Sequence, residues 1–194
     1  AINGNTGVMG GTQDNSNPYV SGNEVDPKTG KVLYSGDGGW SAFSLLNPDA
    51  FYGTSQYANI WRSSDAGKTY QSGSEYKFLS PVMFDDNNNI TPGADGAGPF
   101  VTPLLIWESY NNLYSPDYTW FVADTDYYVG NPVVVKSHNN SIPFYHVLTS
   151  SDGNLAKGDS VQVQDIVSCH FFAGNYKGVW YTRDALQFGI TGKW

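Results

Sequence analysis

Short runs rich in β-branched and aromatic residues make up most of this chain, and Gly, Asn, Asp, Ser or Pro flank each run. Clear examples are "KVLYS" (31–35), "NIWRS" (59–63) and "NPVVVKS" (131–137). Over no long window do apolar residues recur at the three-and-four spacing of an amphipathic helix. The pattern predicts an all-β chain.

Several of these runs are apolar at successive positions rather than at alternate ones, as in "TPLLIWE" (102–108). Strands that pack between two sheets have this pattern. The 22 Gly and 10 Pro do not indicate disorder, because 40% of the 194 residues are hydrophobic. We therefore expect a folded chain with a substantial core.

The charge balance excludes some partners. The formal net charge is −8, and Arg62 and Arg183 are the only arginines. Nucleic-acid binding needs a basic surface that the sequence does not provide, and an anionic membrane surface is disfavoured for the same reason. Because no run of eighteen apolar residues occurs, we expect no membrane span.

The octet "SSDAGKTY" (63–70) has the composition of a tight turn between strands. Asp65 can accept hydrogen bonds from backbone N–H groups of its own turn. Gly67 can adopt the positive φ that such a turn needs. Ser63 begins the octet and Tyr70 ends it, so these four residues are predicted to have a structural role.

The same octet resembles the Asp-box, the S-x-D-x-G-x-T-aromatic hairpin of sialidase-like β-propellers, with Tyr70 in place of the commoner Trp. Further, "GVMGGTQDNSN" (7–17) followed by "YSGDGGW" (34–40) resembles the paired GTQDN and GDGG motifs of sortilin-like and xyloglucanase-like propellers. The resemblance implies a β-propeller of about three to four blades. Blade motifs would lie around 7–40, 45–84, 102–150 and 160–194.

A second segment, "YTRDALQF" (181–188), resembles the octet from Thr182 onward, but it lacks the Gly and its matching part has seven residues instead of eight. Propellers with these motifs close with more blades than 194 residues supply. The resemblance therefore implies an arc of a larger propeller, which other segments or chains would complete.

Two carboxylates and one ring are the candidate ligand-binding residues. Asp14 and Asp37 lie in the two Gly-rich motifs, and Trp40 directly follows the second. They would form an acidic pair beside an aromatic ring on one face, available to a sugar, a cation or a partner. The alternative is that both Asp residues only form turns. The other tryptophans, among them Trp61, Trp107, Trp120 and Trp180, are predicted to fill the core or to plug blades rather than to stack on sugars.

The sequence contains little that points to a group of catalytic residues. A sialidase needs three arginines for the substrate carboxylate, and this chain has two. A carboxylate pair of a glycosidase stays open, with no spacing that singles out an acid and a nucleophile. None of His138, His146 and His170 accompanies a nucleophile motif. Cys169 precedes His170 on an expected strand, so their side chains should face opposite sides, with Cys169 as a small buried hydrophobe.

Calcium is the one cofactor that the sequence suggests. The segment 84–96 is rich in oxygen ligands, although its Gly and Glu do not fit an EF-hand. Its candidate ligands are Asp85, Asp86, Asn88 and Asp95. The alternative is a solvated, Asn-rich loop.

Together these features favour a non-catalytic, extracellular or cell-surface module, of bacterial origin, that binds a glycan or a protein partner. A second hypothesis is part of a glycoside hydrolase of the xyloglucanase-like propeller type, with Asp14 or Asp37 as acid residues. A third is a viral or phage receptor-binding head, because aromatic, acidic β-domains without disulfides have a similar composition.

Overall fold

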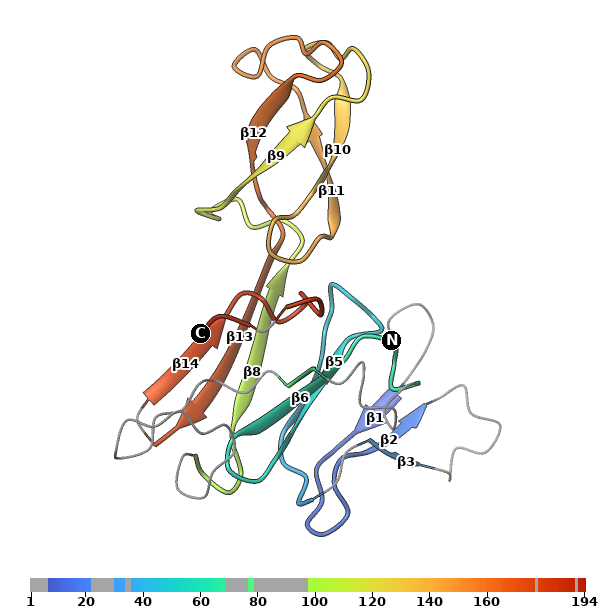
Figure 1. Cartoon of the computed structure of the whole chain (residues 1–194), viewed down its shortest axis with the longest axis vertical. Coiled ribbons are helices and arrows are strands. Elements are labelled where there is room, and N and C mark those ends of the chain that lie inside the picture. The colour runs from blue at the N-terminus through green and yellow to red at the C-terminus, as the bar shows by residue number, and fades with distance from the viewer. Residues whose placement is uncertain are drawn as a thin grey trace. The chain divides into compact units, whose positions relative to one another are not determined.

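The computed structural model is all-β and describes residues 7–21, 30–33, 36–68, 77–78, 98–176, 178–190 and 192–194 (Figure 1). No helix occurs among these residues. Their strands are β1 (Gly7–Met9), β2 (Pro18–Ser21), β3 (Lys31–Val32), β4 (Ser41–Phe43), β5 (Phe51–Ser55), β6 (Asn59–Ser63), β7 (Lys77–Phe78), β8 (Leu104–Ser109), β9 (Tyr118–Val122), β10 (Pro132–Lys136), β11 (Pro143–Val147), β12 (Ser160–Gln164), β13 (Ser168–Asn175) and β14 (Gly178–Thr182).

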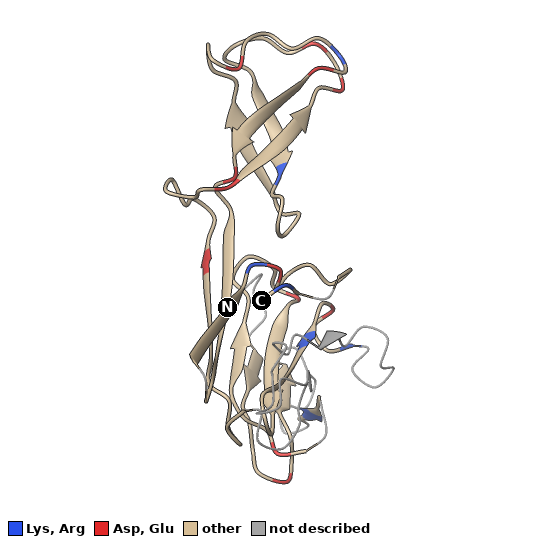
Figure 2. Cartoon of the chain, turned by 60° about the vertical axis from the view of Figure 1, so that its left-hand side comes forward, with Lys and Arg blue, Asp and Glu red and all other residues tan. Residues whose placement is uncertain are grey.

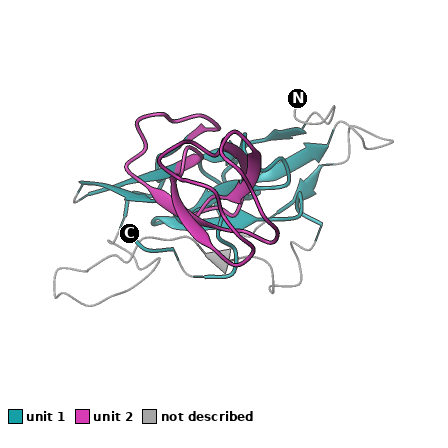
Figure 3. Cartoon of the chain, turned by 90° about the horizontal axis from the view of Figure 1, so that it is seen from above, with its two compact units in different colours: residues 1–107, 170–194 teal, residues 108–169 magenta. Residues whose placement is uncertain are grey.

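The chain divides into two compact units (Figure 3). Unit 1 comprises residues 1–107 and 170–194, and unit 2 comprises residues 108–169. The division falls within strands β8 and β13, which are hydrogen-bonded neighbours in one sheet. Unit 2 is therefore an insertion between two paired strands.

Unit 1 is centred on the antiparallel sheet β4-β5-β6-β7. Every residue of β5 is buried, and so is every residue of β6 after Asn59. This burial explains the runs without apolar alternation, because both faces of the two strands are covered. On one face, Phe51 contacts the rings of Tyr19, Phe43 and Trp61. On the other face, the Tyr52 ring lies 4.8 Å from that of Phe171 in β13.

Two hairpins of unit 1 contribute most of these contacts. Strands β5 and β6 pair from Phe51↔Ser63 to Ser55↔Asn59. Strands β13 and β14 pair from Phe171↔Thr182 to Asn175↔Gly178.

The sheets of the described residues have two to four strands each and do not close on themselves. The arrangement of these sheets as propeller blades stays a prediction.

Unit 2 consists of two antiparallel strand pairs, β9 with β12 and β10 with β11. Burial alternates along β9 and β10 with the period of two that a strand with one solvated face requires. The inward residues form a small apolar core: Phe121, Val133, Val135, Phe144, Leu148, Leu155 and Val163. The hydroxyl of Thr119 in β9 donates to the main-chain oxygen of Lys136 in β10 at 2.9 Å, which links the two pairs.

Acidic residues lie in turns rather than in strands (Figure 2). Within the described ranges, Glu108 in β8 is the only acidic residue that a strand contains. Carboxylates in turns can accept hydrogen bonds from backbone N–H groups that have no partner in a β-sheet. The chain is therefore acidic overall, although its strands contain few charged side chains.

No helix among the described residues is long and apolar enough to cross a membrane.

Candidate functional site

The two Gly-rich motifs of unit 1 lie against each other. Ser16 N donates to the carbonyl of Gly36 at 2.9 Å, and Gly38 N donates to that of Thr12 at 3.0 Å. A Cβ on Gly38 would overlap the Ser16 carbonyl, and one on Gly11 would overlap the Gly39 carbonyl. Glycine is therefore required here because two backbones approach more closely than side chains allow.

Asp14 and Asp37 meet at this junction. Asp14, at φ 62°, donates its backbone N–H to Asp37 Oδ1 at 2.6 Å. Gln56 Nε2 donates to the other carboxylate oxygen, Asp37 Oδ2, at 2.9 Å. The Asp37 carboxylate thus holds two turns together, which favours a structural role for it. Trp40 is 52% exposed, so its ring is available to solvent.

The octet forms a hydrogen-bonded turn at the end of β6. Ser63 Oγ accepts the Gly67 N–H at 2.9 Å and donates to Asp65 Oδ1 at 3.0 Å. Asp65 Oδ1 also accepts the Lys68 N–H at 3.1 Å, and Gly67 has φ 73°. Tyr70 lies outside the described residues. A similar contact occurs in the second segment, where the Asp184 N–H donates to Thr182 Oγ1 at 3.1 Å.

Sequence reasoning did not find the role of Arg62. This buried side chain donates to four main-chain carbonyls of the turn that follows β14, at 2.7–3.0 Å: Asp184, Ala185, Gln187 and Ile190. Its guanidinium also lies 4.8 Å from the centre of the Phe188 ring. Burial lowers the pKa of Arg62, while Tyr52 and Asp184 oppose that effect. The only available signal was an arginine within an otherwise apolar strand.

Four rings cover the solvent face of the sheet β14-β13-β8. His170 contacts Trp107 at 5.2 Å, edge to face, and lies nearly parallel to Tyr181, with centroids 6.2 Å apart. The ring of Phe172 contacts both His170 and Tyr181. The prediction that Trp107 fills the core is wrong, because it is 45% exposed, whereas Trp61 is buried as predicted. Burial lowers the pKa of His170 and so favours the neutral imidazole.

Cys169 lies on the opposite face of β13 from this aromatic cluster and is buried, as predicted. Its thiol donates to Glu108 Oε1 at 3.5 Å. Burial, with a smaller contribution from the Glu108 carboxylate, raises the pKa of the Cys169 thiol well above its ordinary value. A buried, protonated thiol is not a nucleophile.

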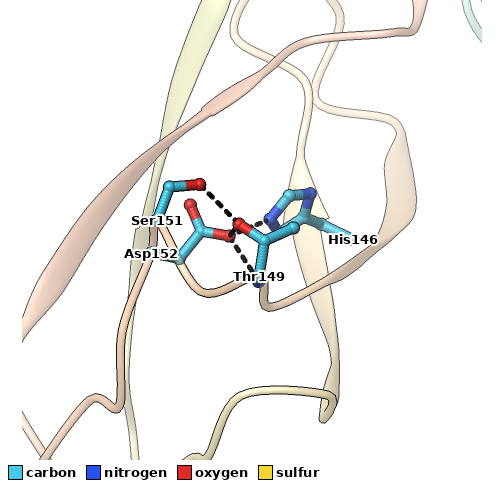
Figure 4. Close-up of polar contacts among 4 residues, drawn as sticks. All are labelled: His146, Thr149, Ser151 and Asp152. Carbon is cyan, nitrogen blue, oxygen red and sulfur yellow. Dashed lines mark hydrogen bonds and ion pairs between the residues drawn. The ribbon is translucent and has the colours of Figure 1, made fainter.

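One His–Asp pair in unit 2 joins His146 of β11 to Asp152 in the turn that follows this strand (Figure 4). Asp152 Oδ2 accepts from His146 Nε2 at 3.0 Å and from the Thr149 hydroxyl and N–H at 2.7 Å each. Partial burial opposes ionisation, but the bonds from Thr149 and His146 outweigh it and lower the pKa of the Asp152 carboxyl. The Thr149 hydroxyl donates to the Asp152 carboxylate, and the Ser151 hydroxyl bonds that of Thr149 rather than the imidazole. The arrangement is therefore a capped turn, because a nucleophile needs a base for its proton.

The outer surface of unit 2 carries exposed rings beside an open cleft. The cleft has a volume of about 560 Å³ and lies between β9 and β10. Its lining includes Trp120, Val122, Tyr127, Val134 and Lys136. Trp120 is 62% exposed, so the prediction that it fills the core is also wrong.

A cross-strand pair places an amide beside Trp120, which lines the cleft. Gln162 in β12 lies opposite Trp120 in β9, and both are exposed. Paired residues of an antiparallel ladder project from the same face. The Trp120 ring, on which a ligand can stack, and the Gln162 amide, which can donate and accept hydrogen bonds, therefore lie side by side. The only signal in the sequence was the alternation of polar and apolar residues in "SVQVQ" (160–164), which places Gln162 on a solvated face.

The proposed calcium ligands Asp85, Asp86, Asn88 and Asp95 lie outside the described residues. Among the residues that are described, no group of three or more His, Cys, Asp or Glu side chains could hold a metal ion.

Comparisons of the chain with protein-family models, with curated proteins and with solved structures found no match.

Proposed function

We propose that this chain is a non-catalytic binding module that holds a glycan in the cleft of unit 2. The observation that carries the proposal is the exposed Trp120 ring beside Gln162 at the edge of an open cleft. Sugars present C–H faces that pack on aromatic rings and hydroxyls that pair with amides. An open cleft between two strand pairs suits one or a few sugar units rather than an enclosed small molecule.

The chemistry of the remaining side chains supports binding rather than catalysis. The Asp37 carboxylate accepts two hydrogen bonds at a turn junction, and that of Asp152 accepts bonds within its own turn. The Cys169 thiol is buried. A glycoside hydrolase with Asp14 or Asp37 as its acid residue is therefore the less favoured alternative.

The Asp-box resemblance extends this proposal to the rest of the chain. In it, unit 1 is part of a β-propeller arc of a secreted or cell-surface protein, and unit 2 is an insertion that carries the ligand site. The octet turn, the joined Gly-rich motifs and the antiparallel four-stranded sheet support this view.

Binding to an array of immobilised neutral and acidic oligosaccharides tests the glycan proposal. We expect Trp120→Ala to weaken binding about ten-fold, as the loss of one stacked ring implies. Tyr114→Ala is the matched control, because Tyr114 is an exposed ring of the same unit that lies in a turn outside the lining of the cleft. Failure of the wild-type chain to bind any glycan, or equal losses in both variants, would overturn the proposal.

A protein-binding role is the second candidate, and the four-ring cluster of unit 1 favours it. Trp107 and Tyr181 are about half exposed in a surface that also contains His170 and Phe172. Aromatic residues are enriched in protein interfaces, and an arc of a propeller would leave one sheet face for a neighbouring sheet. The double variant Trp107→Ser with Tyr181→Ser should reduce binding of a hydrophobic dye, and unchanged dye binding would contradict an apolar docking face.

A further inference from the structure

We infer that the cleft of unit 2 selects a glycan with one carboxylated sugar, whose carboxylate pairs with Lys136 while a neighbouring neutral sugar packs on Trp120. This inference rests on the proposed glycan binding and specifies the ligand of the same cleft. It follows from the position of the charges in the lining.

Lys136 is the only cation that lines the cleft. It is the last residue of β10, and the burial pattern places it on the outer face with Pro132 and Val134. Within the described part of the chain, no carboxylate lies within ion-pair distance of its ammonium group. In a chain of net charge −8, an unpaired cation beside a stacking ring is a local feature that favours an anionic ligand group.

A single carboxylate at the other end limits how much negative charge the ligand can carry. Asp124 also lines the cleft, and its Oδ1 accepts the Tyr127 hydroxyl proton at 2.8 Å. The Thr119 hydroxyl donates to the main-chain oxygen of Lys136, so the backbone of Lys136 lies beside the start of β9. Asp124 lies beyond the other end of β9, and the three residues of strand from Thr119 to Val122 alone span about 10 Å.

The two ends of the cleft therefore differ in sign. A sugar carboxylate is attracted near Lys136 and repelled near Asp124. Trp120 follows Thr119, the residue of β9 that bonds the Lys136 backbone, so it lies toward the Lys136 end. A ligand that carries a carboxylate on every sugar would place a negative charge against Asp124. The favoured ligand has one acidic sugar attached to neutral ones, in a single orientation.

Titration of the full chain with glucuronoxylotriose, and with the same oligosaccharide after reduction of its carboxyl group to an alcohol, tests this inference. We expect the acidic probe to bind about 5- to 10-fold more tightly, the range of one partly exposed charge-assisted contact. Raising NaCl from 0.05 to 0.5 M should reduce this preference, because salt screens exposed charges.

Substitutions of Lys136 test whether its positive charge, rather than a change in folding, causes the preference for the acidic probe. Lys136→Gln should abolish the preference for the acidic probe over the reduced one, while Lys136→Arg should retain that preference. Lys157→Gln is the control, because Lys157 is an exposed cation of unit 2 outside the lining. Equal binding of the two probes by the wild-type chain would overturn the inference and leave glycan binding standing. Binding of neither probe, nor of any glycan on the array, would overturn both.

Discussion

Arg62 Nη1 donates to the main-chain oxygen of Ala185 at 2.7 Å, so a buried guanidinium in β6 holds a turn 123 residues further along the chain. The same side chain donates to the carbonyls of Asp184, Gln187 and Ile190. A planar guanidinium with five donors can serve several carbonyls at once, and an ammonium cannot copy this geometry. One side chain thus joins the hairpin β5-β6 to the turn after β14.

Arg62→Lys should therefore lower the free energy of unfolding of unit 1 by about 3 kcal/mol, because it leaves buried carbonyls without donors. Arg62→Met should cost at least as much. Urea denaturation followed by tryptophan fluorescence measures the change. Lys68→Met, at an exposed position, is the control and should shift the free energy by less than about 0.5 kcal/mol. Equal stability of Arg62→Lys and the wild type would contradict the clamp.

Gly10 and Gly11 form a matched pair of neighbours for testing the junction of the two Gly-rich motifs. A Cβ on Gly11 would overlap the backbone of Gly38 and Gly39, whereas a Cβ on Gly10 meets nothing within 4 Å. We expect Gly11→Ala to cost about 3 kcal/mol or more, as overpacking against backbone does. Gly10→Ala should be nearly neutral. Thermal unfolding of the two variants side by side provides the measurement, and equal melting temperatures would show that the motifs do not touch.

Asp152→Asn tests the capped turn of unit 2. Its carboxylate accepts three hydrogen bonds, so we expect the variant to lose about 1 kcal/mol of unfolding free energy at pH 7. Because the folded state lowers the pKa of Asp152, this contribution is present above the unfolded-state pKa of about 3.9 and is lost as the pH falls through the folded-state pKa.

The difference between the wild type and Asp152→Asn should therefore narrow below about pH 4 in urea titrations at several pH values. Asp126→Asn is the control, since Asp126 accepts a single bond, from the Lys157 N–H. A difference that stays constant from pH 7 to pH 2 would rule out the carboxylate as its cause.

The Cys169 thiol should resist modification while the chain is folded. Burial and the Glu108 carboxylate both disfavour the thiolate, which is the reactive form. A thiol reagent at pH 8 should label the native protein at least about 100-fold more slowly than the urea-unfolded protein, as a raised pKa of this kind implies. Rapid labelling of the native protein would show that the thiol is accessible.

The fold class followed from local patterns. Runs of β-branched and aromatic residues bounded by turn formers predicted an all-β chain, which is confirmed, because strand formation and turn chemistry depend mainly on residues near in sequence. Consecutive apolar residues, as in "TPLLIWE" (102–108), indicated strands covered on both faces. That holds for β5 and β6 but is wrong for β8, where Leu105 is 63% exposed. The prediction that Trp61 is buried also rested on such a local pattern.

The placement of the other tryptophans did not follow from local patterns. Trp107 and Trp120 lie in strands as apolar as that of Trp61, yet both are exposed. The side of a strand that is buried depends on whether another sheet covers it, which residues elsewhere in the chain determine. Sequence reasoning therefore missed the aromatic cluster of unit 1 and the cleft of unit 2.

By itself, the sequence determined the all-β class and the turn at Ser63–Lys68. These depend on backbone sterics and on hydrogen bonds between near neighbours. Only the tertiary structure decided that glycine is required where the two motifs touch, that Asp37 joins two turns, that Arg62 serves a turn near the other end of the chain, and that Trp120 and Lys136 line one cleft. Those relationships depend on contacts between distant segments, and no spacing along the chain encodes the distance between two folded strands.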